Sequence, residues 1–294
     1  MGTSSVFGGQ GGASPLVPSF VGDAGAPSAD DAADATYRDE DGDGTPPPSD
    51  PPQPPQRPPV PPNADPTRFT AARNNFSRFA SSGGTDRASL GRALSHYVDS
   101  STGGARGAAG RMGSARGAGS RLLGFLADAT TRGITEALRA LDLADLAGRP
   151  IEEVFLGLAD YICPDGGSVD EGIAREAFIE TIVDLAAAGI TDLDTLSEDQ
   201  MQTVFELYAT NAIEARLCND IGTKAVMLPA SARDAASVQA QLNDFIRRGV
   251  ADALSAARVA AAALTPDRVL GFVARVYEQA FDILRIMGDA EANA

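Results

Sequence analysis

Histidine, cysteine and lysine are scarce in this chain of 294 residues. The sequence contains one histidine, His96, two cysteines, Cys163 and Cys218, and one lysine, Lys224. A single histidine and two distant cysteines cannot supply the usual ligand set of a zinc site, so we expect no metal and no cofactor. Two cysteines also exclude a disulfide framework and fit a reducing cytoplasm.

Catalytic motifs are missing as well. No phosphate loop of the Gly-x4-Gly-Lys-Ser/Thr type is present. A nucleophilic pair would need His96 beside one of the two cysteines, whereas a histidine on a helix face more often packs or is exposed to solvent. We therefore expect no catalytic residue, and a protein that is not an enzyme.

Long apolar runs are absent too. No run approaches the roughly 18 residues of a membrane-spanning helix, and no basic segment precedes an apolar one as in a signal peptide. We expect a soluble, cytoplasmic protein without membrane contact.

Residues 1–65 form a compositionally distinct tail. Five of the first 12 residues are glycine, and a small apolar island follows that includes Leu16, Val17, Pro18 and Phe20. An acidic stretch comes next, and then residues 46–62 with 11 prolines. Such a composition cannot bury enough apolar surface to offset the entropy of ordering, so we predict a disordered tail whose proline tract is an extended spacer.

Charge divides the remaining chain. Residues 66–121 contain nine arginines and two aspartates, net +7, whereas residues 122–294 contain 28 acids and 13 bases, net −15. The acidic body argues against binding of nucleic acid by the whole protein. The basic segment is an exception that could contact phosphate or the acidic body of the chain itself.

Residues 66–121 are predicted to hold short helices and a basic segment. Phe69, Phe76 and Phe79 share one helix face, and Thr85 is a candidate N-cap for the next helix. In residues 100–121 an arginine recurs every fifth residue among glycines, at Arg106, Arg111, Arg116 and Arg121. A five-residue step does not form one helical stripe, and glycine weakens helices. The alternatives are a solvated connector and a flexible basic loop that contacts phosphate or a partner.

Residues 122–294 are predicted to be an α-helical body, which makes the fold mainly α: a disordered tail followed by a multi-helix bundle. Apolar residues at helical spacing predict helices over 134–146, 151–162, 168–188, from 197 onward, 235–263 and from 266 to about 288. Capping boxes begin two of them, Ser168 with Glu171 and Ser197 with Gln200. The segment Ala225–Leu228 is the only weak strand candidate.

The last predicted helix begins with a cap, Thr265, followed by Pro266 at its first position. Gly288 is its expected end. Its buried face is predicted to consist of Val269, Leu270, Val273, Val276, Tyr277, Phe281 and Leu284.

Two polar runs stand out within the body. The first covers residues 162–168, and the second, residues 213–224, crowds several charged and polar side chains: Glu214, Arg216, Asn219, Asp220 and Lys224. The second run fits a helix end with a buried ion pair, and it equally fits a patch that faces a partner or ligand. Asp170 and Glu171 suit the positive end of a helix and need no catalytic role.

Three segments carry a family resemblance. The opening MGTSSVFGGQGGASPLVPSF, residues 148–176 (GRPIEEVFLGLADYICPDGGSVDEGIARE) and residues 213–224 (IEARLCNDIGTK) resemble the QatB component of the bacterial Qat antiphage system. The likeness covers the head and most of residues 66–255, and excludes the acidic and proline-rich spacer. The resemblance implies partners from a four-component operon: a P-loop ATPase, a QueC-like enzyme of 7-deazapurine synthesis and a TatD-like metal-dependent DNase.

The resemblance also implies a role for the N-terminus. QueC-type enzymes use ATP to activate a deazaguanine carboxylate, which an amine then attacks. Removal of the initiator methionine would expose the amine of Gly2, and an α-amine with a pKa of about 8 is partly nucleophilic at pH 7. The island Leu16, Val17, Pro18 and Phe20 would dock on the enzyme as an extended peptide. The alternatives are a helical scaffold that joins the ATPase to the QueC-like enzyme, and nucleic-acid sensing through the arginine-rich segment.

Overall fold

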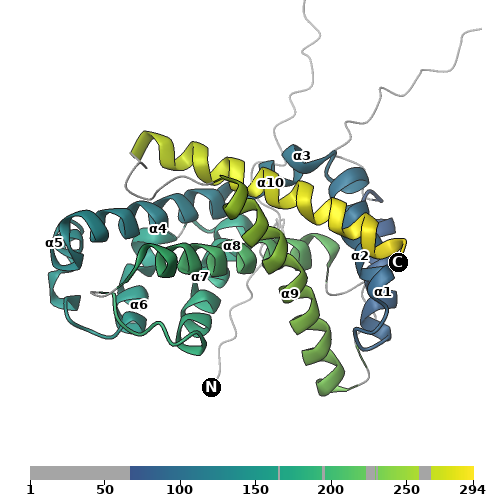
Figure 1. Cartoon of the computed structure of the whole chain (residues 1–294), viewed down its shortest axis with the longest axis horizontal. Coiled ribbons are helices and arrows are strands. Elements are labelled where there is room, and N and C mark those ends of the chain that lie inside the picture. The colour runs from purple at the N-terminus through teal and green to yellow at the C-terminus, as the bar shows by residue number, and fades with distance from the viewer. Residues whose placement is uncertain (1–66, 165, 194–195, 223–228, 230, 258–265) are drawn as a thin grey trace, which may run out of the picture. The chain divides into compact units, whose positions relative to one another are not determined.

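The computed structural model describes residues 67–164, 166–193, 196–222, 229, 231–257 and 266–294, all within one compact unit. These residues form helices and contain no strand, which confirms the predicted fold class (Figure 1). The predictions for residues 1–65 and for Ala225–Leu228 lie outside the described residues. The helices are α1 (Thr70–Ser81), α2 (Arg87–His96), a π-helical turn η3 (Tyr97–Ser101), α3 (Ala105–Gly110), α4 (Gly113–Arg132), α5 (Ile134–Arg139), a 3-10 turn η4 (Ala144–Leu146), α6 (Ile151–Ile162), α7 (Val169–Ala187), α8 (Glu198–Ile221), α9 (Ala232–Ala257) and α10 (Pro266–Ala292).

Aromatic side chains fill the core at two places. Phe155 of α6 stacks on Phe178 of α7 with ring centroids 5.6 Å apart, and Tyr208 of α8 meets Phe178 edge-on at 6.4 Å. Near the other end, Tyr97 lies between Phe69 and Phe281 at 5.8 and 6.2 Å. Such ring pairs add to the stabilisation by apolar burial. The first group holds together the consecutive helices α6, α7 and α8, and the second joins the start of the described chain to α10.

Helix α10 packs along α2 and against α9 (Figure 1). At the contact with α2, Gly91 and Gly288 face each other so closely that a Cβ atom on Gly288 would lie 2.6 Å from the carbonyl oxygen of Gly91. The prediction that Gly288 ends the last helix is therefore wrong, because α10 continues to Ala292. This glycine is needed for close helix packing and does not form a C-cap.

The arginine- and glycine-rich segment is helical. Neither a solvated connector nor a flexible loop is observed, because residues 105–110 and 113–132 form α3 and α4. Gly119 explains why glycines are tolerated in α4: a Cβ there would lie 3.1 Å from the ring of Tyr208 and 3.3 Å from that of Phe205. Close packing of a small-residue face offsets the low helix propensity of glycine. The boundary at residue 121 that charge suggested falls inside α4.

Several predicted caps are confirmed. Ser168 and Glu171 form the capping box of α7, and Ser197 and Gln200 form that of α8. Helix α6 ends at Ile162, as predicted. Thr265, the predicted cap of α10, lies outside the described residues.

Two other predicted boundaries are wrong. Asp86, and not Thr85, caps α2, since its carboxylate accepts from the backbone N–H of Ser89 at 3.0 Å. The predicted helix over 134–146 ends at Arg139, and the chain then turns through Asp142, whose φ is 60°. Aspartate tolerates the left-handed region better than most residues, so the chain reverses at that point.

Candidate functional site

The four regularly spaced arginines point to different partners. Arg106 lies on the surface of α3 and pairs with Glu278 of α10 at 3.3 Å. Arg111 reaches Asp220 of α8, and Arg121 donates from its Nε to the carbonyl oxygen of Ile162 at the end of α6 at 2.8 Å. The Nε of Arg116 is buried and has no hydrogen-bond partner among the described residues. The four side chains therefore do not form one surface that follows a phosphate backbone.

Asp220 is the centre of a buried polar cluster. Arg111 donates twice to its carboxylate, from Nε to Oδ2 at 2.8 Å and from one terminal nitrogen to Oδ1 at 2.7 Å. The hydroxyl of Tyr97 donates to Oδ2 at 2.8 Å, and a terminal nitrogen of Arg216 lies 3.8 Å from Oδ1. The carboxylate is 3% exposed, so these contacts replace its hydration.

The cluster extends to two further helices. Arg216 donates to Oδ1 of Asp170 at the start of α7 at 2.7 Å. Arg73 of α1 donates to the carbonyl oxygens of Asp220 and Ile221, which are among the free carbonyls at the end of α8. We call this set, Arg73, Tyr97, Arg111, Asp170, Arg216 and Asp220, the Asp220 cluster.

The Asp220 cluster is suited to holding helices together and not to proton transfer. Burial, together with the adjacent Asp220 carboxylate, raises the pKa of Tyr97 well above its usual value, so its proton stays on the hydroxyl. Both carboxylate oxygens of Asp220 already accept charged or hydroxyl donors. The cluster therefore ties together α1, η3, the junction of α3 and α4, α7 and α8.

The predicted polar patch of residues 213–224 is divided by the helix that carries it. Arg216 and Asp220 lie on the buried side of α8, whereas Glu214 accepts from the amide of Asn243 on α9 at 2.7 Å. Asn219 is exposed. Lys224 lies outside the described residues. The buried ion pair expected at this helix end is present, and Glu214 belongs to a different surface.

Both cysteine thiols are held in their protonated form. Burial raises the pKa of Cys163 to about 11 and that of Cys218 to about 12. Sγ of Cys163 also donates to the carbonyl oxygen of Ala174 at 3.5 Å. Because the thiolate is the nucleophile, neither thiol is activated for attack at neutral pH. His96, the other candidate, lies 3.4 Å from the hydroxyl of Ser100.

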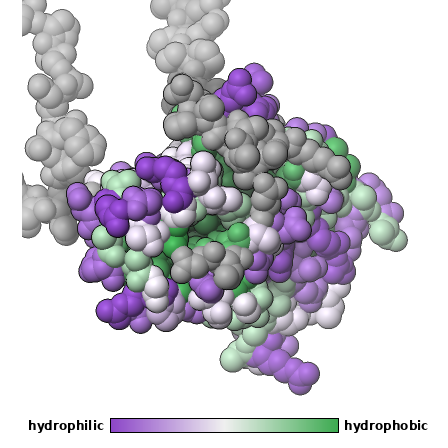
Figure 2. Space-filling model, turned by 60° about the vertical axis from the view of Figure 1, so that its left-hand side comes forward, coloured by the Kyte–Doolittle hydropathy of each residue, from purple (hydrophilic) through white to green (hydrophobic). Residues whose placement is uncertain are grey.

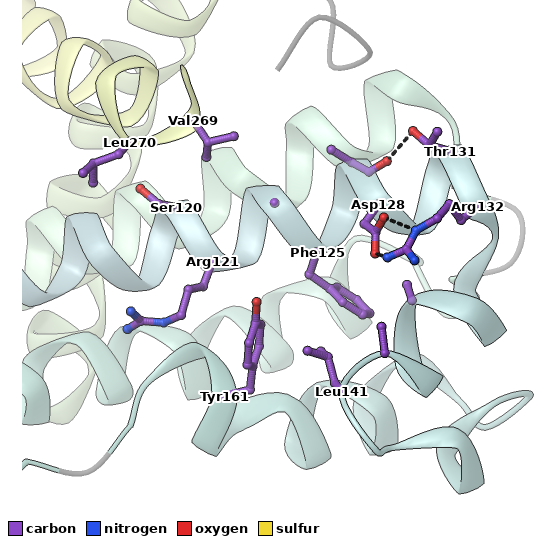
Figure 3. Close-up of a pocket in the computed structure, with 14 residues that line it drawn as sticks. Ser120, Arg121, Phe125, Asp128, Thr131, Arg132, Leu141, Tyr161, Val269 and Leu270 are labelled. Carbon is purple, nitrogen blue, oxygen red and sulfur yellow. Dashed lines mark hydrogen bonds and ion pairs between the residues drawn. The ribbon is translucent and has the colours of Figure 1, made fainter. Parts of the chain in front are cut away.

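An apolar groove of about 640 Å³ lies between α4, α5, α6 and the start of α10 (Figure 3). Phe125, Leu141 and Tyr161 converge on it, and Leu270 stands at its opposite rim (Figure 3). The prediction that Leu270 is buried is wrong, because its side chain is 57% exposed; Tyr161 is 40% exposed. Figure 2 shows hydrophobic residues gathered in a hollow on one face of the molecule. Exposed apolar groups gathered in a hollow are typical of a surface that binds another molecule.

Comparison with known proteins identifies the family. A family model described as "QatB: Qat anti-phage system associated protein QatB" matches residues 103–284, more than half of the chain. The chain belongs to the QatB family. The resemblance drawn from its sequence is confirmed. Searches of the curated proteins and of the solved structures each found no match.

The QatB match begins after η3 and ends within α10. It includes Arg111, Asp170, Arg216 and Asp220 of the Asp220 cluster, and leaves out Arg73 and Tyr97. Residues 1–102 precede it, so the Gly-rich head is not part of the matched segment. No described helix is long and apolar enough to cross a membrane, and no three metal-ligating side chains gather within the described ranges.

Two members of the Asp220 cluster, Arg73 and Tyr97, are not predicted from the sequence. Arg73 lies in an ordinary amphipathic helix, and Tyr97 is a buried aromatic residue of the short turn η3. No local signal marks either residue, because their partner Asp220 is more than 120 residues away in sequence.

Proposed function

We propose that this QatB-family chain is a non-enzymatic component of an antiphage defence complex that binds a QueC-like enzyme and offers its N-terminus as that enzyme's protein substrate or carrier. Family membership is the observation that carries the defence role. The reactive atom would be the amine of Gly2, exposed by removal of Met1.

The polar chemistry of the helical body supports this division of labour. Asp220 is saturated by arginine and tyrosine donors, and the thiols of Cys163 and Cys218 are protonated at neutral pH. These groups act in packing, so the weight of function falls on the residues that precede the body. Two free cysteines support a reducing compartment, and we place the complex in the cytoplasm.

In the proposed reaction the partner enzyme activates a carboxylate of a 7-deazapurine with ATP. The neutral amine of Gly2 attacks the carbonyl carbon of the resulting acyl adenylate, the bond from that carbon to the adenylate oxygen breaks so that AMP leaves, the amine gives up a proton, and an amide bond forms. A pKa of about 8 leaves a useful fraction of the α-amine neutral at pH 7. Leu16, Val17, Pro18 and Phe20 would bind the enzyme as an extended segment, and the proline tract would give reach.

The test is the intact mass of the full chain, expressed with and without the QueC-like enzyme. We expect a mass increase only with the enzyme, and its loss in Gly2→Glu, which retains the initiator methionine. The chain offers a sharp control: Lys224 carries its only side-chain amine, so Lys224→Arg should leave the mass increase unchanged. An unchanged wild-type mass, or a modification that survives in Gly2→Glu, would contradict the proposal.

A helical scaffold is the second candidate, and the groove of Figure 3 favours it, because this apolar surface lies on the body and not on the tail. The scaffold would join the QueC-like enzyme to the P-loop ATPase or the TatD-like DNase. Deletion of residues 2–20 separates the two functions. If the chain is a scaffold, the variant without residues 2–20 should still assemble with its partners and still protect cells against phage. If the chain is a substrate, the variant should still assemble but should no longer protect cells.

A further inference from the structure

A second groove runs between α7, α8 and α9, and we call it the α8–α9 groove. One end, of about 310 Å³, is apolar and is lined by Phe76, Ile221, Val238 and Leu242. The other end, of about 560 Å³, is lined by acids. Glu214, Cys218 and Gln239 line both ends, so the two hollows adjoin each other.

The acidic end carries negative charge that the protein does not neutralise. Four of its carboxylates have no ion-pair partner within the described part of the chain: Glu176, Glu180, Asp184 and Glu214. The cation in the lining, Arg247, is already paired with Glu206 at 2.7 Å.

Two of these carboxylates accept a hydrogen bond from a neutral amide. Asn211 donates to Asp184 at 2.8 Å and Asn243 donates to Glu214 at 2.7 Å. Burial raises the pKa of Glu214, and the neighbouring carboxylates of Asp184 and Glu180 raise it further. The groove thus keeps an electrostatic demand for a cation beside an apolar surface.

We propose that the α8–α9 groove binds a segment of a partner protein in which arginine or lysine lies next to large apolar side chains. The apolar residues would enter the end formed by Phe76, Val238 and Leu242. The basic residues would pair with Glu176, Glu180 and Asp184. The proposal does not depend on modification of Gly2, and nucleic acid is disfavoured there because its phosphates would meet carboxylates.

Exposed alanines of α9 provide clean test positions. Ala236 and Ala240 line the acidic end, and both are exposed on the helix surface. Ala240→Arg would place a cation in the groove without creating a cavity or breaking a hydrogen bond. Ala256→Arg is the matched control, because Ala256 is an exposed residue of the same helix outside the groove.

The experiment selects random 12-residue phage-displayed peptides on the full chain and measures the selected peptides by fluorescence anisotropy. We expect sequences that combine Arg or Lys with Leu, Ile, Phe or Met. Their affinity should fall at least tenfold in Ala240→Arg and by less than twofold in Ala256→Arg. Replacing the basic residues by Gln, or the apolar ones by Ser, should each lower the affinity at least tenfold.

Four results would overturn the proposal. Selection could yield no saturable binder, or binders without basic residues. Affinity could fall equally in Ala240→Arg and Ala256→Arg, which would show attraction to the net negative charge of the chain. Binding could also survive loss of the apolar residues, which would mean that the apolar end of the groove is not used.

Discussion

Asp220 and Glu214 are acids on the same helix, α8, six positions apart, and their surroundings are opposite. Asp220 is 3% exposed and is surrounded by Arg111, Arg216 and the hydroxyl of Tyr97. Glu214 is partly buried and meets one neutral amide donor, from Asn243, and further carboxylates. On one side of α8 the negative charge of Asp220 is neutralised by arginines, and on the other side the negative charge of Glu214 has no cationic partner among the described residues.

The comparison separates stability from binding. A fully paired buried carboxylate fixes helices but has no capacity left for a ligand. An uncompensated carboxylate weakens the folded state slightly and favours a cation that arrives from outside. Helix α8 therefore contributes Asp220 to the Asp220 cluster on one side and Glu214 to the α8–α9 groove on the other.

Removal of the Asp220 carboxylate should have the largest effect on stability. Asp220→Ala leaves Arg111 without its counter-charge and Arg216 with Asp170 alone, and we expect a loss of about 3–5 kcal/mol in the free energy of unfolding. Urea denaturation followed by circular dichroism measures it. Asp282→Ala, which removes an exposed pair with Arg285, should change the same quantity by less than about 0.5 kcal/mol. Similar losses of stability in both variants would show that the Asp220 cluster contributes no more to the fold than an exposed ion pair.

Weaker hydrogen bonding to Asp220 should have an intermediate effect on stability. Arg111→Lys keeps the positive charge but cannot make two parallel hydrogen bonds to Asp220, so we expect a loss of about 1–2 kcal/mol. Arg106→Lys is the control, because the side chain of Arg106 is 89% exposed and its pair with Glu278 lies in solvent. Equal stability of Arg111→Lys and the wild type would mean that charge alone holds the cluster.

A change at Glu214 should have the smallest effect on the free energy of unfolding, and it should stabilise the fold where the two previous changes destabilise it. The pKa of Glu214 is raised in the folded chain above its ordinary 4.5, so folding favours the protonated form and stability from this group is lost as pH rises above that value. Glu214→Gln removes the titration. We expect the Glu214→Gln variant to be more stable than the wild type at pH 7. The gain in its free energy of unfolding should be smaller than the loss expected for Arg111→Lys.

The pH dependence checks that assignment. At pH 4 the carboxyl of Glu214 is mostly protonated in both the folded and the unfolded state, so most of the advantage of Glu214→Gln over the wild type should disappear there. Denaturation at pH 4 and pH 7 measures both values. A variant that is less stable than the wild type at pH 7 would show that the charge of Glu214 is compensated after all.

Local signals predicted much of the fold. Ser168 with Glu171 and Ser197 with Gln200 announce helix starts correctly, since a capping box involves only residues three apart. The ends predicted from glycine and leucine spacing were less secure. Gly288 packs against Gly91, almost 200 residues earlier, and Leu270 is exposed although it follows the buried Val269.

Some residues of the candidate site were predictable from the sequence, but their assembly was not. Both Arg111 and Asp220 stood out in the sequence, one for its regular spacing and the other for its crowded polar run. Nothing local indicated that they meet, because 109 residues separate them. Their pairing joined two features that the sequence presented as unrelated.

The sequence by itself determined that this chain is helical, where α7 and α8 begin, and that it resembles the QatB family, because helical periodicity, caps and family motifs are local. Tertiary structure decided that the Gly-rich arginine segment is helical, that Asp220 is buried and paired with arginines, and that Glu214 has no cationic partner among the described residues. The physical reason is that burial and charge pairing depend on neighbours brought together by folding, and their energies exceed the local preferences of single residues.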